Sequence, residues 1–374
     1  MPSKPTSSKP LTSLICIVVT YEIRVFFEGA QKEGGQTSSP PSAVFIFGDS
    51  LVDVGNNNYI TTLARANLPP NGIDFPQGPT GRFCNGRTVA DLLVESFGLS
   101  YPLPYLAPNN KGSMILKGVN FASAAAGILD STGYDYIGRI PMNQQLQWAA
   151  NTKSQIVQLV GEAQAEAIFA NALFSVTMGS NDYINNYLLK GSSTSSSYNP
   201  QQYQDLLIST FSQQLTTLYN LGARKVVVTA VGPLGCIPSQ LVLQFSVNGE
   251  CVPFINGYVQ GFNAALKSLL QQLTSTLPGA TFVYANAYEM VQSFINNPAN
   301  YGFTTVNDGC CGRGPYNGLV PCIPGASVCP NRRLFFFWDP FHPTEAANIM
   351  LSNAFLSGGT DVIEPVNIQQ LVAM

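Results

Sequence analysis

The stretch AVFIFGDS, residues 43–50, is a short apolar run that ends in small and polar residues. This pattern is typical of a buried parallel strand that runs into a turn. Three later stretches share this character, because each begins with apolar and β-branched residues and ends in turn residues; they are residues 172–182, 223–235 and 280–288. The sequence therefore predicts a buried strand at each of these four places.

A helical pattern precedes each of the three later strands. Apolar residues recur at three- and four-residue spacing within residues 144–171, 201–221 and 253–276. Strands that alternate with helices indicate a parallel sheet that helices cover on both faces, and ligands of such sheets bind beyond the carboxyl ends of the strands. We expect one domain over residues 43–374, with the serine-rich residues 191–200 as a flexible surface loop.

The first 42 residues are typical of a targeting segment and a spacer. Lys4 and Lys9 precede the apolar run LTSLICIVVTY, residues 11–21, which has the length of a signal-peptide core and is too short to span a bilayer. We predict a signal peptide over residues 1–30 and a spacer over residues 31–42. The protein is therefore expected to be secreted, and no later segment of the sequence is long enough to predict stable insertion into a membrane.

Charge is sparse along the chain. Lysine and arginine number 18 and aspartate and glutamate 21, so that charged residues make up 10% of the sequence. No basic field exists that would attract phosphate backbones, which excludes nucleic acid as an expected partner. The sequence does not fix the oligomeric state.

The cysteines favour an oxidising compartment. Cys16 would leave with the signal peptide, Cys236 and Cys251 bracket a short excursion, and four more cysteines lie within residues 310–329. These spacings predict one local disulfide and two in the later loop, with Cys84 as the candidate free thiol. The alternative for the later loop is a zinc site, which is disfavoured because the loop has no C-x-x-C pair and the single histidine lies elsewhere.

His342 is the only histidine in the chain, and Asp339 precedes it by three positions. A serine hydroxyl becomes a nucleophile when a base accepts its proton, and the base works best when a carboxylate fixes its tautomer. Ser50 ends the first predicted strand, where a turn would expose its hydroxyl. His342 is therefore the candidate general base, Asp339 the carboxylate that orients it, and Ser50 the nucleophile. The alternatives are a helix N-cap for the serine and a structural histidine.

Further polar residues close the predicted strands. The side-chain amide of Asn181 is a candidate donor to an oxyanion, with an Asx turn as the alternative. We expect Asp182 to cap a helix or orient the loop. Asp49 and Asp53 are possible metal ligands in principle, but no imidazole stands beside them in the sequence, so we expect turn and surface roles.

Seven stretches, in chain order, resemble the plant GDSL-motif esterases and lipases, a branch of the SGNH hydrolases; they are FIFGDSLVDVGNNNYI, GRFCNGRTVADLL, GVNFASAAAGILD, TMGSNDYINNY, VVVTAVGPLGCIP, CCGRG and LFFFWDPFHPTEAAN. The resemblance runs from about residue 43 to the C-terminus. It implies a three-layer α/β/α fold of flavodoxin-like type with a central parallel sheet of about five strands. The sequence has no G-x-S-x-G, G-K or G-x-G-x-x-G pattern, which argues against an α/β-hydrolase elbow, a P-loop and a dinucleotide site, and no cofactor is expected.

The resemblance also implies roles for individual residues. Ser50 matches the nucleophile, Asp339 and His342 match the DxxH pair, and Asn181 matches the oxyanion asparagine, with the Ser50 N–H as a further donor. The family commonly has glycine where this chain has Ala125, and the N–H of that residue completes the oxyanion hole. Alanine supplies the same N–H if its dihedrals suit a residue with a Cβ, and a shifted register would place Gly127 there instead.

The function that this resemblance implies is a secreted serine esterase or lipase that cleaves carboxylic esters through an acyl-enzyme. An acyltransferase that uses the same acyl-enzyme is one alternative, and a secreted binding protein without turnover is another. The aromatic residues Phe335–Trp338 and Phe341 fit either an acyl-chain pocket or ordinary core. Neither the natural ester nor its acyl length follows from the sequence.

Overall fold

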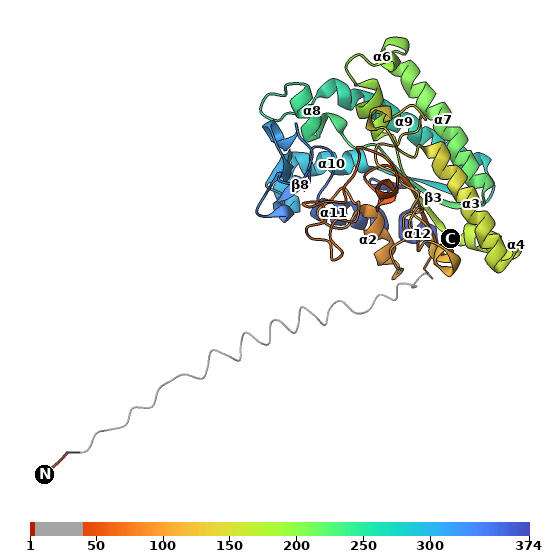
Figure 1. The fold of residues 1–374 in the computed structure, drawn as a ribbon, viewed down its shortest axis with the longest axis horizontal. Coiled ribbons are helices and arrows are strands. Elements are labelled where there is room, and N and C mark those ends of the chain that lie inside the picture. The colour runs from red at the N-terminus through yellow and green to blue at the C-terminus, as the bar shows by residue number, and fades with distance from the viewer. Residues whose placement is uncertain (4–39) are drawn as a thin grey trace. The chain divides into compact units, whose positions relative to one another are not determined.

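Four parallel strands form the centre of the fold in the computed structural model, which describes residues 1–3 and 40–374 (Figure 1). The strands lie in the order β1 (Val44–Gly48), β2 (Leu173–Thr177), β3 (Lys225–Thr229) and β4 (Thr281–Ala285). Every residue of β1 and β2 is buried, as expected of strands that are covered on both faces. All four predicted strands are confirmed, whereas the predicted signal peptide and nearly all of the spacer lie outside the described residues.

The two edges of the sheet differ from the predicted sheet of about five parallel strands. The fifth strand, β9 (Ile363–Glu364), pairs antiparallel with β4, so the sheet is mixed. At the other edge, a short segment runs parallel to β1: the Ile46 N–H donates to the Val119 carbonyl (3.0 Å) and the Phe121 N–H donates to the Ile46 carbonyl (2.7 Å). With this segment counted, the parallel strands follow the chain order 2-1-3-4-5 of flavodoxin-like sheets.

Helices cover both faces of the sheet, which confirms the three-layer arrangement (Figure 1). One layer contains α3 (Met142–Val160), α7 (Pro200–Asn220) and α9 (Pro253–Thr276). The other contains α2 (Val89–Ser96), α11 (Glu345–Ser357) and α12 (Ile368–Ala373). The remaining α-helices are α4 (Glu162–Asn171), α5 (Ser180–Asp182), α6 (Ser193–Ser197), α8 (Pro238–Leu243) and α10 (Ala287–Asn296).

Two helical predictions need correction. The pattern over residues 144–171 belongs to two helices, because Gly161, with φ 84°, ends α3 and begins α4. The serine-rich residues 191–200 are not simply a loop, because Ser193–Ser197 form the short helix α6. The Ser192 hydroxyl caps this helix by accepting the N–H groups of residues 194 and 195.

The cysteines pair as predicted. Disulfides join Cys236 to Cys251, Cys310 to Cys329 and Cys311 to Cys322, and Cys84 is a buried free thiol. The zinc alternative is wrong, because all four cysteines of the later loop are used in disulfides. This loop contains a small two-stranded sheet, β6 (Cys311–Gly312) with β7 (Ser327–Val328). A second one, β5 (Thr305–Gly309) with β8 (Phe335–Phe337), joins the segments on either side of the loop.

Within residues 1–3 and 40–374, no helix is both long and apolar enough to cross a membrane.

Candidate active site

Ser50 lies in the tight turn that follows β1. A Cβ at Gly48 would lie 2.5 Å from the Thr177 carbonyl oxygen of β2, so the end of β1 requires glycine. The fully buried side chain of Gln145 in α3 fixes the start of this turn by two hydrogen bonds to Gly48. Its Oε1 accepts the Gly48 N–H (3.0 Å), and its Nε2 donates to the Gly48 carbonyl (2.8 Å). The half-buried Ser50 hydroxyl is thereby presented at the carboxyl edge of the sheet.

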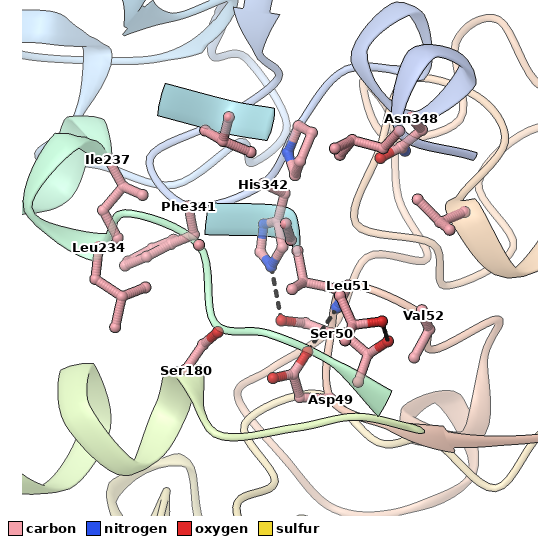
Figure 2. Close-up of a pocket in the computed structure, with 18 of the residues that line it drawn as sticks. Asp49, Ser50, Leu51, Val52, Ser180, Leu234, Ile237, Phe341, His342 and Asn348 are labelled. Atoms are coloured by element: carbon pink, nitrogen blue, oxygen red, sulfur yellow. Dashed lines mark hydrogen bonds between the residues drawn. The ribbon is translucent and has the colours of Figure 1, made fainter. Parts of the chain in front are cut away.

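The structure brings Ser50, His342 and Asp339 together. His342 Nε2 lies 2.7 Å from Ser50 Oγ (Figure 2). His342 Nδ1 lies 2.8 Å from each carboxylate oxygen of Asp339. Asp339 and His342 are only 3% and 6% exposed. Ser50 caps no helix, and its hydroxyl is directed at the imidazole.

Backbone and aromatic contacts fix the turn that carries Asp339 and His342. Asp339 Oδ1 accepts the N–H groups of Phe341 and His342, both at 2.8 Å. The Trp338 N–H donates to the His342 carbonyl (2.7 Å), while the buried Trp338 indole donates to Asn71 Oδ1 (2.9 Å). Because two backbone N–H groups hold the carboxylate, it keeps one orientation relative to the imidazole ring.

The backbone N–H groups of Ser50 and Ala125 have no hydrogen-bond acceptor among the described residues. Ala125 lines a cavity together with Ser50, Asn181 and His342, and its φ of 67° is in the left-handed region that favours glycine. Gly127 does not line this cavity; a Cβ there would lie 2.4 Å from a Thr132 methyl carbon.

Asn181 and Asp182 connect the end of β2 to the loop that carries Ala125. Asn181 Nδ2 donates to the Ala126 carbonyl (2.9 Å), and Asn181 Oδ1 accepts from Asn185 Nδ2 (2.6 Å), which fixes the amide orientation. The buried Asp182 carboxylate accepts the N–H groups of residues 128 and 129 and the Thr132 hydroxyl. Asp182 therefore orients the loop, as expected, and burial raises its pKa to about 6.

The surface roles expected for Asp49 and Asp53 are wrong, since the two residues are 1% and 0% exposed. Asp53 accepts the N–H groups of Gly55, Asn56 and Ala124, and burial raises its pKa to about 6. Asp49 Oδ1 accepts the Leu51 N–H, but Asp49 Oδ2 has no partner among the described residues (Figure 2). Burial raises the pKa of Asp49 to about 7.

A buried polar network that the sequence did not reveal joins the loop after Ser50 to the loop of Ala125. Asn56 Nδ2 donates to the carbonyls of Asn120 and Ala122, and Asn57 Nδ2 donates to those of Ala64 and Ala124. The Ser123 hydroxyl donates to Asn57 Oδ1. Asn56 and Asn57 belong to a run of three asparagines at 56–58, but the run does not show which carbonyl groups their amides reach.

Two cavities meet at Ser50 and His342. The inner cavity, of about 120 Å³, lies between the sheet and helices α10 and α11 and includes Val291, Leu351 and Phe355 in its wall. The outer cavity, of about 160 Å³, includes Leu63, Phe83, Ala125 and Ile323.

The aromatic run before His342 divides between the inner cavity and the core. Phe336, Phe337 and Phe341 line the inner cavity, whereas Phe335 and Trp338 pack with the buried cysteines of the later loop. Phe336 and Phe337 also belong to the main hydrophobic core, so this part of the run is core that borders a cavity, and the acyl-chain pocket stays a prediction.

Known proteins of one family match almost the whole described domain of this chain. A family model described as GDSL-like lipase/acylhydrolase matches residues 44–355. GDSL esterase/lipase 7 of Arabidopsis thaliana is 45% identical over 97% of this chain and 100% of its own length. Two further Arabidopsis proteins named GDSL esterase/lipase are 47% and 43% identical, over 88% and 96% of this chain and 90% and 96% of their own lengths. The chain belongs to the GDSL-like lipase/acylhydrolase family.

Proposed function

We propose that this protein is a secreted serine hydrolase that cleaves carboxylic esters through an acyl-enzyme. The observation that carries the proposal is the continuous hydrogen-bonded path from Ser50 Oγ through the His342 ring to the Asp339 carboxylate. Hydroxyl, imidazole and carboxylate in this order are the parts that activate a serine nucleophile. The names of the related Arabidopsis proteins, esterase/lipase, agree with an ester as substrate.

Each residue of the path has one role in the proposed reaction. Ser50 Oγ attacks the ester carbonyl while His342 Nε2 accepts the hydroxyl proton, and Asp339 stabilises the imidazolium that forms. His342 then gives this proton to the departing alcohol, which leaves Ser50 acylated. Water attacks the acyl-enzyme with His342 again as the base, and the acid is released.

Three donors border the outer cavity beside Ser50, where we expect the negative charge to develop. The N–H groups of Ser50 and Ala125 have no acceptor among the described residues, and the Asn181 amide has a second N–H beyond the one used by Ala126. We assign all three to the oxyanion, which preorganised donors of this kind stabilise.

Secretion is part of the proposal. Three disulfides in residues 236–329 accord with folding in an oxidising compartment, where such bonds persist. The signal peptide proposed for residues 1–30 is tested by N-terminal sequencing of protein secreted from a plant cell culture.

The test of the reaction is Ser50→Ala. We expect hydrolysis of p-nitrophenyl acetate to fall to the background rate, with the melting temperature within a few degrees of the wild type, because the change removes only the nucleophile. Ser154→Ala, on the exposed side of α3, is the matched control and should keep full activity. Release of free acid with no ester of an added alcohol distinguishes hydrolysis from acyl transfer. Undiminished turnover by folded Ser50→Ala protein would refute the assignment.

A further inference from the structure

The outer cavity at Ser50 adjoins a third cavity, of about 280 Å³. The two spaces share one wall, because four residues line both of them; these are Arg65, Asn71, Cys322 and Ile323. A molecule bound at Ser50 can therefore extend into the third cavity and bring one of its groups against Arg65 and Asn71.

Arg65 is the one permanent cation among the described residues that line these two cavities. Its guanidinium forms no ion pair with a carboxylate of residues 1–3 or 40–374. In the described part of the chain, Asp339 is the one acidic residue that lines either cavity, and His342 and two backbone N–H groups already hold its carboxylate. The positive charge of Arg65 therefore has no protein counter-charge in these cavities.

Hydrogen bonds fix the segment that carries Arg65. The Thr62 hydroxyl donates to the Tyr136 carbonyl (3.1 Å) and accepts the Ala64 N–H (3.0 Å). One end of the guanidinium donates to the Ile60 carbonyl. Its other N–H groups have no acceptor among the described residues, and they form a planar fork that fits two oxygens of a carboxylate or phosphate group.

Asn71 supplies a second donor at the shared wall, and its side chain is fixed although it comes from a loop. The residue is 5% exposed, and its Oδ1 accepts the Trp338 indole N–H (2.9 Å). Its Nδ2 makes one long hydrogen bond, to the Cys322 carbonyl (3.4 Å), so the second N–H of this amide has no acceptor among the described residues. A buried donor without an acceptor is unfavourable, and an oxygen atom of a ligand would relieve this cost.

On the basis of the proposed function, we infer that Arg65 and Asn71 bind a carboxylate or phosphate group of the substrate, so that the protein prefers negatively charged esters to neutral ones. Leu68 and Ile323 border the same space with apolar side chains. A ligand that displaces water from between them experiences a lower local dielectric, which strengthens its attraction to the guanidinium.

The test compares an anionic ester with a neutral ester of similar shape, in two pairs. The charge lies in the alcohol half for p-acetoxybenzoate against p-acetoxybenzamide, and in the acyl half for mono-p-nitrophenyl adipate against p-nitrophenyl hexanoate. In Arg65→Gln we expect the ratio of kcat/KM, anionic to neutral, to fall about tenfold for at least one pair, because a charge-assisted hydrogen bond is lost. The fall should lie mainly in KM, since the anion is bound equally before and during the reaction.

Further variants separate the charge of Arg65 from its shape and from its position. Arg65→Lys keeps the charge without the planar fork and should retain part of the preference. Arg333→Gln is the matched control and should keep the wild-type ratio, because Arg333 is exposed and lines neither cavity. Added salt should lower the ratio of the wild type but not that of Arg65→Gln, since mobile ions screen the attraction.

Asn71→Asp tests the second donor. The change keeps an oxygen that accepts the Trp338 indole N–H, but it replaces the free donor by a negative charge. We expect the ratio of the responding pair to fall at least as far as in Arg65→Gln. Thermal melting of each variant shows whether it is folded.

Binding is measured apart from turnover with Ser50→Ala protein. Isothermal titration calorimetry should give a lower Kd for the anionic than for the neutral member of at least one pair, and Ser50→Ala combined with Arg65→Gln should lose this preference. The pair that responds identifies the half of the ester that carries the anion.

The inference and the proposed function fail in different ways. Ratios within about twofold of the wild type for both pairs in folded Arg65→Gln, or no preference for either anion in the binding measurement, would overturn the inference. Both results leave the assignment of Ser50 intact, whereas undiminished turnover by Ser50→Ala would remove it.

Discussion

Ala125 stands at a position whose backbone favours glycine. Its φ of 67° costs a residue with a Cβ about 1–2 kcal/mol, yet the N–H that this conformation presents is the same for alanine and glycine. Ala125→Gly should therefore keep the proposed oxyanion donor. Ala125→Val should lose at least tenfold in kcat/KM relative to Ala125→Gly, because a β-branched residue avoids positive φ and moves the N–H.

Hydrolysis of p-nitrophenyl acetate and the rate of fluorophosphonate labelling check this ranking. Equal activity of the folded valine and glycine variants would mean that the N–H of residue 125 takes no part in the reaction. Ala124→Gly is a suitable control, since the Ala124 N–H already donates to Asp53.

Asp49 makes stability depend on pH. Its pKa is about 7 in the folded protein against 3.8 for an unperturbed carboxyl, because burial disfavours the charged form. The folded state therefore holds the proton more tightly than the unfolded state. The resulting stability is fully present below about pH 4 and is lost as the pH rises to about 7, at about 1.4 kcal/mol for each pH unit between the two pKa values.

Asp49→Asn should remove this contribution, because an amide does not ionise and retains the oxygen that accepts the Leu51 N–H. We expect the melting temperature of the variant to decline less between pH 4 and pH 7 than that of the wild type. Asp361→Asn, at an exposed carboxyl, is the control and should follow the wild-type curve. A variant curve parallel to the wild type across this range would contradict the buried, protonated state of Asp49.

At the scale of elements, the sequence predicts those helices and strands that a local pattern of apolar and turn residues determines. The strands β1 to β4 are recognisable because each is a short, mostly apolar run before turn residues. Helices α7 and α9 follow their predicted ranges within one residue. The segment around Asn120 and the two-residue strand β9 are too short to show a pattern, and only their partners β1 and β4 make them part of the sheet. The break at Gly161 is invisible because apolar spacing continues on both sides of it.

At the site, too, the sequence predicts features that depend on nearby residues and misses those that depend on distant ones. The single histidine, the aspartate three residues before it and a serine at a strand end make His342, Asp339 and Ser50 candidates, and the resemblance to the GDSL esterases implies their roles. The positions of Gln145 and the asparagine network are not predictable, because most of the hydrogen bonds concerned join residues that are 64 to 97 positions apart and exist only in the assembled fold. The burial of Asp49 was missed for the same reason, since exposure depends on helices that are distant in the sequence.

At the scale of the whole molecule, the parallel sheet explains why distant segments meet. The carboxyl ends of β1 and β2 lie side by side and present Ser50 and Asn181, and the turn before α11 adds His342 from 292 residues away. The later loop, which disulfides hold, borders the outer cavity through Cys322 and Ile323. The fold thus places the serine where two cavities meet, at the carboxyl edge of the sheet.

The most direct test of the account is the activity of His342→Gln. No other imidazole exists in the chain to replace the base, and glutamine has similar size without the ability to accept the serine proton. We predict that kcat for p-nitrophenyl acetate falls on the order of 10⁵-fold, as in other enzymes that lose one member of a cooperating triad. A folded His342→Gln protein with kcat within tenfold of the wild type would contradict the assignment of Ser50, His342 and Asp339 as the catalytic unit.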